Sequence, residues 1–125
     1  MPPIVAPPRI SVCLLTYNHA NVIADCVRSV LAQDLSDFEL ILSDDCSTDA
    51  TWETLTEFAK ADSRIRVLRT PRNLGMAGNA NFAVANSTAP FIALLHHDDV
   101  YRPDLLRRWL EVIERHPDMG FVSNG

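Results

Sequence analysis

Two pairs of adjacent aspartates are the residues in this sequence best suited to hold a metal ion. Asp98 and Asp99 follow the apolar run 91–95 and two histidines, and Asp44 and Asp45 follow another apolar run. Adjacent carboxylates raise each other's pKa unless a positive group lies beside them. Mg²⁺ and Mn²⁺ are such groups, and one or two carboxylates commonly hold them together with substrate phosphates. Asp98 and Asp99 therefore predict a hard-cation site whose ligand carries phosphate.

Each pair also has a purely structural explanation. Both pairs precede a helix pattern, and acidic residues there favour the helix dipole. Ser47, Thr48 and Asp49 are typical of a loop and a helix cap. His96 and His97 raise the alternative of zinc, which needs about four ligands, and no cluster with suitable spacing accompanies them in the sequence. The occurrence of both acidic pairs at the ends of predicted strands favours the hard-cation hypothesis.

Strand and helix patterns alternate along the chain. Apolar runs of strand length are typical of strands covered on both faces, and helical periodicity follows each of the first four. The expected strands are 10–15, 38–42, 65–68, 91–95 and 119–122, and the expected helices begin near Asn21, Trp52, Ala77 and Pro103. This alternation predicts an α/β fold with a mostly parallel central sheet flanked by helices on both faces.

The ligand crevice of such a sheet lies beyond the carboxyl ends of the strands. Most polar residues that interrupt the apolar runs fall at this edge, including the following: Thr16, Tyr17, Asn18, Asp44, Asp45, Asp98 and Asp99. The turn TYNHAN after the first strand contains no glycine, so neither a dinucleotide fingerprint nor a phosphate-binding P-loop is present there. We therefore expect a metal to carry the phosphate charge.

Composition narrows the class of protein. The 125 residues suit one domain, and a net charge of −5 from 11 basic and 16 acidic residues argues against a nucleic-acid partner. Three separated cysteines do not form a secreted disulfide framework, so we expect a cytoplasmic protein. No apolar run approaches the roughly 18 to 20 residues of a membrane span, although peripheral membrane association of a longer protein stays open. Residues 1–9 form a Pro-rich lead-in.

Four segments carry a family resemblance: SVCLLTYN, FELILSDDCSTDAT, NLGMAGNAN and LLHHDDVYRPD. In residue type, order and spacing they resemble the family 2 glycosyltransferases of the GT-A fold, and the resemblance covers residues 10–125. It implies a Rossmann-like fold in which residues 10–125 form the N-terminal, nucleotide-sugar-binding part. The chain stops just after the last expected strand, so we expect a truncated GT-A domain.

The resemblance also implies roles for residues after the first two strands. Thr16, Tyr17 and Asn18 would form one edge of the nucleotide pocket, with Tyr17 packing on the base. Asp45 would accept the imide N–H of uracil or thymine, which cytosine lacks. Asp44 would support the same loop.

Further roles follow from the later segments. Asn73 would lie near the nucleotide-sugar, Asp98 would face the ribose or sugar, and Asp99 would bind Mn²⁺ or Mg²⁺. Many family members carry an acidic residue where His96 stands, which leaves the choice of metal open. The implied reaction is metal-dependent, inverting transfer of a sugar from a UDP- or dTDP-sugar to an acceptor hydroxyl, for example in cell-surface polysaccharide synthesis.

No residue of this chain is assigned as the catalytic base, which we expect beyond residue 125. These 125 residues are therefore expected to bind the donor without efficient transfer. One alternative is a non-catalytic module that binds nucleotide-sugars. Another is a nucleotidyltransferase, which would ordinarily have a basic, Gly-rich loop after the first strand. The donor sugar, the acceptor and the oligomeric state stay open.

Overall fold

Strands and helices alternate along the described part of the chain, as the apolar runs predict. The computed structural model describes residues 7–97, 99–118 and 120. The elements are β1 (Ile10–Thr16), α1 (Ile23–Leu31), β2 (Phe38–Asp44), α2 (Thr51–Ala61), β3 (Ile65–Arg69), α3 (Gly75–Ala85), β4 (Phe91–His96) and α4 (Leu105–Arg115). Of the strand expected at 119–122, only residue 120 is among the described residues.

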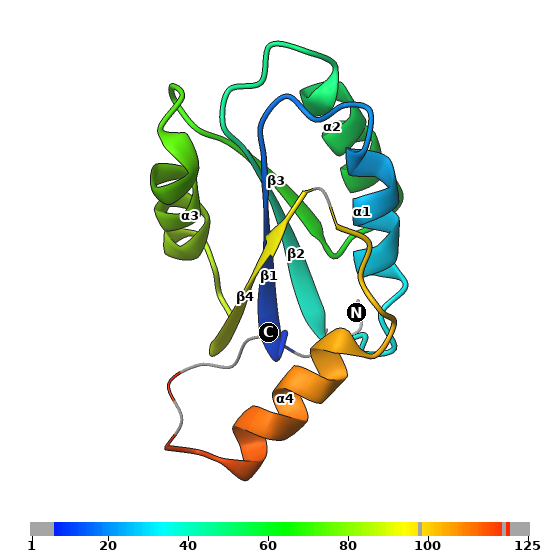
Figure 1. Cartoon of the computed structure of the whole chain (residues 1–125), viewed down its shortest axis with the longest axis vertical. Helices are drawn as coiled ribbons and strands as arrows, with labels where there is room; N and C mark the ends of the chain where they lie inside the picture. Colours follow the sequence, from blue (N-terminus) through cyan, green and yellow to red (C-terminus); the bar gives the residue numbers. More distant parts are fainter. Residues whose placement is uncertain (1–6, 98, 119, 121–125) are drawn as a thin grey trace, which may run out of the picture.

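The sheet has the strand order β3-β2-β1-β4, and every neighbouring pair is parallel. Helix α3 covers one face, while α1 and α2 cover the other (Figure 1). The chain adds strands outward from β1 to β3 and then places β4 on the opposite side of β1. This reversal of strand order marks the position where open α/β sheets bind ligands, just beyond the carboxyl ends of β1 and β4.

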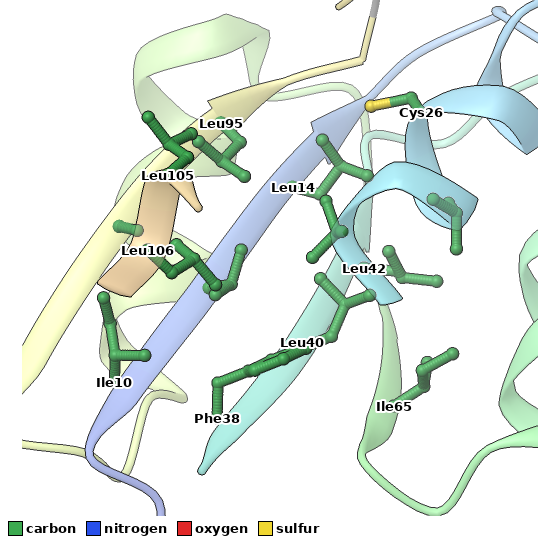
Figure 2. Packing of buried hydrophobic residues seen from close by; sticks show 14 of the residues in the cluster. Ile10, Leu14, Cys26, Phe38, Leu40, Leu42, Ile65, Leu95, Leu105 and Leu106 are labelled. Carbon is green, nitrogen blue, oxygen red and sulfur yellow. The ribbon is translucent and has the colours of Figure 1, made fainter. Parts of the chain in front are cut away.

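The continuous apolar runs are explained by burial on both faces of the sheet. All seven residues of β1 and all seven of β2 are buried. Leu14, Leu40 and Leu42 pack in the larger cluster with Leu106 of α4 (Figure 2), whereas Cys13 packs in a smaller cluster under α3. Within residues 7–97, 99–118 and 120, none of the helices has the length and apolar character that crossing a bilayer requires.

Two helix starts differ from the positions that the sequence indicates. Helix α1 begins at Ile23, two residues after Asn21, and its cap is Val22, which makes no side-chain cap hydrogen bond. Helix α4 begins two residues after Pro103, and its Leu106 N–H donates to Gln33 Oε1 at 3.0 Å. A side chain that follows α1 therefore supplies the acceptor, which local sequence patterns do not reveal.

Glu39 of β2 is a buried carboxylate that ties the segment between α3 and β4 to the sheet. It accepts hydrogen bonds from Ser11 Oγ at 2.5 Å, from the backbone N–H and Oγ1 of Thr88 at 2.8 Å each, and from Arg66 Nη1 at 3.0 Å. Burial by itself would raise the pKa of Glu39, but these hydrogen bonds outweigh burial and hold the pKa below its ordinary value.

Glu39→Gln is expected to lower the free energy of unfolding by about 2 kcal/mol near neutral pH, because hydrogen bonds to a buried charge are lost. The pKa of Glu39 is lower in the folded protein than in the unfolded chain, where it is about 4.3. Glu39 therefore adds its full stabilisation above the unfolded-state pKa, and this stabilisation is lost as the pH falls through the folded-state pKa. Urea unfolding of both proteins across this range checks the prediction. The difference should shrink in acid, whereas a constant difference would contradict the assigned role. Glu57→Gln, at an exposed ion pair with Lys60, is the matched control and should change little.

Candidate functional site

A pocket of about 280 Å³ lies at the carboxyl edge of the sheet, at the reversal of strand order. It brings together Thr16, Tyr17, Asp45 and Asn73, four of the residues that the sequence singles out. The described residues that line it are Leu15, Thr16, Tyr17, His19, Asp45, Asn73, Gly75, Met76, Asn79, His96 and His97. The tyrosine side chain is 42% exposed, so its ring is accessible to a ligand.

Asp45 supplies the one carboxylate among the described residues that line this pocket. Its Oδ1 accepts hydrogen bonds from Thr70 Oγ1 at 2.9 Å and from the Leu74 N–H at 2.8 Å, and its Oδ2 accepts one from the Gly75 N–H at 2.9 Å. A carboxylate has about four lone-pair positions, two on each oxygen. Among the described residues, these three hydrogen bonds fill Oδ1 and leave one acceptor position on Oδ2.

The loop 70–75 takes its shape from the same aspartate. Asn73 Nδ2 donates to the Asp45 carbonyl at 3.2 Å, and Gly75 has a φ of 79°, in the left-handed region that favours glycine. The N–H groups of Leu74 and Gly75 lie at the start of α3, where backbone donors lack partners within the helix. Asp45 therefore holds the N-terminus of α3 against the pocket.

Asp44, the last residue of β2, does not line the pocket. Its side chain is fully buried, with Oδ1 accepting from Thr16 Oγ1 at 3.0 Å and from Ser47 Oγ, and Oδ2 accepting from the Ser47 N–H at 3.1 Å. Arg69 Nε lies 4.0 Å from Oδ2. These contacts fit the expected support of the loop, not direct contact with a nucleotide.

Asn18 also has a role within the protein. It adopts a positive φ of 52°, and its Oδ1 accepts from the N–H groups of Thr48 at 2.8 Å and Asp49 at 3.3 Å. Its own backbone N–H donates to Ser47 Oγ at 2.9 Å. Asn18 therefore joins the loop after β1 to the loop after β2, beside the pocket wall.

The second acidic pair lies in a different position from the first. Asp98 is outside the described residues. Asp99 is exposed and lines a larger cavity of about 800 Å³ that extends along β4 and α4. Of the residues that the structure describes, His96 is the one common to the linings of both cavities. Asp45 and Asp99 therefore share an edge of the sheet but not one cavity, and His96 lies between the two.

Two histidines form part of the pocket wall. The ring centroids of His19 and His97 are 3.3 Å apart, with 35° between the ring planes. His97 Nδ1 lies 3.2 Å from the Leu15 carbonyl, which can only accept, so this nitrogen carries the proton. His19 Nδ1 is buried and has no hydrogen-bond partner in the described part of the chain. Such a group costs about 1 to 3 kcal/mol, and nothing in the sequence pattern points to it.

The side chains at this edge fit a hard cation only if a phosphate ligand completes the coordination. No group of three or more His, Cys, Asp or Glu side chains within residues 7–97, 99–118 and 120 is arranged to hold a metal. Asp99 offers the carboxylate oxygen that Mg²⁺ and Mn²⁺ prefer, and these ions are commonly bound by one or two carboxylates plus substrate phosphates. The imidazoles of His96 and His97 are softer donors.

The sequence matches the family Glycosyl transferase family 2 over residues 11–124. The chain belongs to this family. One curated relative of this family 2 glycosyltransferase is TuaG of Bacillus subtilis, which is named as a candidate teichuronic acid biosynthesis glycosyltransferase. TuaG is 38% identical over 117 residues, and the match covers 93% of this chain and 46% of TuaG. The succinoglycan biosynthesis protein ExoO of Rhizobium meliloti is 36% identical over 104 residues, and the match covers 83% of this chain and 29% of ExoO. The chain thus spans less than half the length of both relatives.

Solved structures give the same fold. The crystal structure of S. aureus TarS 1-349 in complex with UDP-GlcNAc is 27% identical with a TM-score of 0.79, and the match covers 87% of this chain and 32% of TarS. The mannosyltransferase PcManGT of Pyrobaculum calidifontis, in complex with GDP-Man and Mn²⁺, is 22% identical with a TM-score of 0.80. This match covers 86% of this chain and 33% of PcManGT, and it supports the fold alone. The expected GT-A fold is therefore confirmed.

Proposed function

We propose that this family 2 glycosyltransferase binds a UDP- or dTDP-sugar, with the pyrimidine base in the 280 Å³ pocket, and transfers the sugar with inversion to an acceptor hydroxyl. The observation that carries the proposal is Asp45 in the lining of that pocket, where its Oδ2 keeps one acceptor position that no donor of the described residues fills. The names of TuaG and ExoO support polysaccharide synthesis as the process.

The open position favours one kind of base. The ring N3–H of uracil or thymine is a single donor and suits one free acceptor. Cytosine has an acceptor at this ring position, which the Asp45 carboxylate repels. Guanine presents two neighbouring donors, but Oδ1 already accepts two hydrogen bonds. Tyr17 would pack its ring on the base. The pocket volume lies near the lower limit of ligand sites, so the diphosphate and sugar must extend outward.

We propose that the diphosphate extends past His96 towards Asp99. His96 borders both cavities, and Asp99 is the exposed carboxylate on the far side. Asp99 would hold Mn²⁺ or Mg²⁺, with Asp98 at the ribose or sugar. When bound, the cation would stabilise the charge that develops on the departing nucleoside diphosphate.

We also propose that these 125 residues bind the donor without efficient transfer. Asp44 and Asp45 are committed to loop contacts inside the protein, and Asp99 is proposed for the cation. The catalytic base would then come from the additional length that the relatives have.

The three cysteines are free thiols, which supports the cytoplasm as the location, with peripheral membrane association of the longer protein.

Calorimetric titration of the chain with UDP, CDP and GDP, each with and without Mn²⁺, tests the base preference. UDP is expected to bind with Mn²⁺, and CDP and GDP at least about tenfold more weakly, a difference of about 1.4 kcal/mol. Without Mn²⁺, UDP binding should weaken because nothing offsets the diphosphate charge. Equal affinities for UDP and CDP would contradict the role of Asp45.

A further inference from the structure

The acidic turn, which here means residues 96, 97 and 99–101, is fixed at His96 and at Tyr101. Tyr101 Oη accepts a hydrogen bond from the His96 N–H at 2.9 Å and donates to the His96 carbonyl at 2.7 Å. Cys26 Sγ donates to the same carbonyl at 3.4 Å, and the Tyr101 N–H donates to Ser29 Oγ at 3.0 Å. The backbone of this turn is therefore anchored to α1 and closed by the tyrosine hydroxyl.

His97 within this turn is held by a ring from another loop. Its Nδ1 lies 3.2 Å from the Leu15 carbonyl, and its ring stacks on His19 at 3.3 Å. The backbone of His19 is itself fixed, because its N–H donates to Thr51 Oγ1 at 2.9 Å and its carbonyl accepts from the N–H of Ile23 at 3.0 Å. His19 thus connects the starts of α1 and α2 to the acidic turn.

The ring of His19, and not its Nδ1, makes the contact with His97. Nδ1 is buried without a hydrogen-bond partner in the described part of the chain, so it supplies no hydrogen bond that a phenylalanine would lack. The flat ring contributes a stacking surface for His97, the residue that leads into the acidic pair. The contact also lies in the wall of the pocket that contains Asp45.

We propose that His19 is a positioning residue for the acidic turn. It acts through His97, and its ring holds the turn in the orientation in which Asp99 meets the cation and diphosphate of the donor. This inference rests on the proposed function for the identity of the ligand. His19 needs no direct contact with the donor, so a flat apolar ring at the same position should preserve its effect.

The test compares His19→Ala and His19→Phe in this chain, with His116→Ala as a control at an exposed histidine that follows α4. UDP affinity is measured with and without Mn²⁺, and amide hydrogen exchange at residues 99–101 is measured without ligand. His19→Ala is expected to weaken Mn²⁺-dependent UDP binding about tenfold, as the loss of supporting contacts around metal ligands does. Binding without Mn²⁺ should weaken less than binding with Mn²⁺, and exchange in the turn should accelerate.

His19→Phe and His116→Ala are expected to match the wild type in both measurements. Melting curves confirm that each variant is folded, and the phenylalanine variant keeps the test valid if the alanine variant is unstable. Unchanged exchange in His19→Ala, failure of phenylalanine to rescue, or equal loss of UDP binding with and without Mn²⁺ would overturn the proposal. If the wild type binds no UDP, the proposed function fails, and the exchange comparison alone decides whether His19 positions the turn.

Discussion

Asp45→Asn is expected to reduce UDP affinity at least about 30-fold, which corresponds to about 2 kcal/mol. The amide nitrogen of asparagine is a donor, and it would face either the Gly75 N–H together with the ring N–H of uracil, or the Leu74 N–H. The three donors that now meet a carboxylate would lose charge-assisted hydrogen bonds. The free energy of unfolding should also fall, by about 2 to 4 kcal/mol, because buried donors are left without partners. Calorimetry and urea unfolding measure the two effects.

The control for this prediction is Asp62→Asn. Asp62 accepts hydrogen bonds from the N–H, Nε and Nη2 of Arg64 and does not line the 280 Å³ pocket. Its replacement should lower stability without changing UDP affinity. Binding by Asp45→Asn is measured at a temperature where circular dichroism shows the variant to be folded. Wild-type UDP affinity in the folded variant would show that Asp45 only shapes the loop.

Asp99→Asn is expected to remove most of the difference in UDP affinity between solutions with and without Mn²⁺. A neutral amide is a poor ligand for a hard cation, so the loss with Mn²⁺ should be at least about tenfold. Stability should change little, since Asp99 is exposed. Titration of Mn²⁺ in the presence of UDP measures the effect. Asp118→Asn, at another exposed aspartate, should behave like the wild type, and an equal loss in both variants would indicate a general effect of charge.

The alternation of elements was predictable because burial on both faces demands continuous apolar runs. The ends of the strands were less predictable from the sequence. Thr16, Ser43 and Asp44 are polar, yet they extend β1 and β2 beyond the apolar runs. They can do so because their side chains find partners inside the protein, such as Thr16 Oγ1 on Asp44 and Ser43 Oγ on Asn79. Local sequence does not show whether such partners exist.

The candidate site was predictable in part for the same reason. Its position at the carboxyl edge follows from the parallel topology, and four of the expected residues line the pocket. The pattern Asp44-Asp45 does not reveal that the Asp44 carboxylate is bound by Thr16 and Ser47 inside the protein, while Asp45 lines the pocket. The stacking of His19 on His97 joins residues far apart in the chain, and no periodicity encodes such a contact.

The most direct test of the account is a crystal structure of the chain with UDP and Mn²⁺. The uracil ring is expected in the pocket between β1 and α3. Its N3 should lie within about 3.2 Å of Asp45 Oδ2, and its face should lie against Tyr17. The diphosphate should extend past His96 towards Asp99. A nucleotide bound in the larger cavity along β4 and α4, or a base turned away from Asp45, would contradict it.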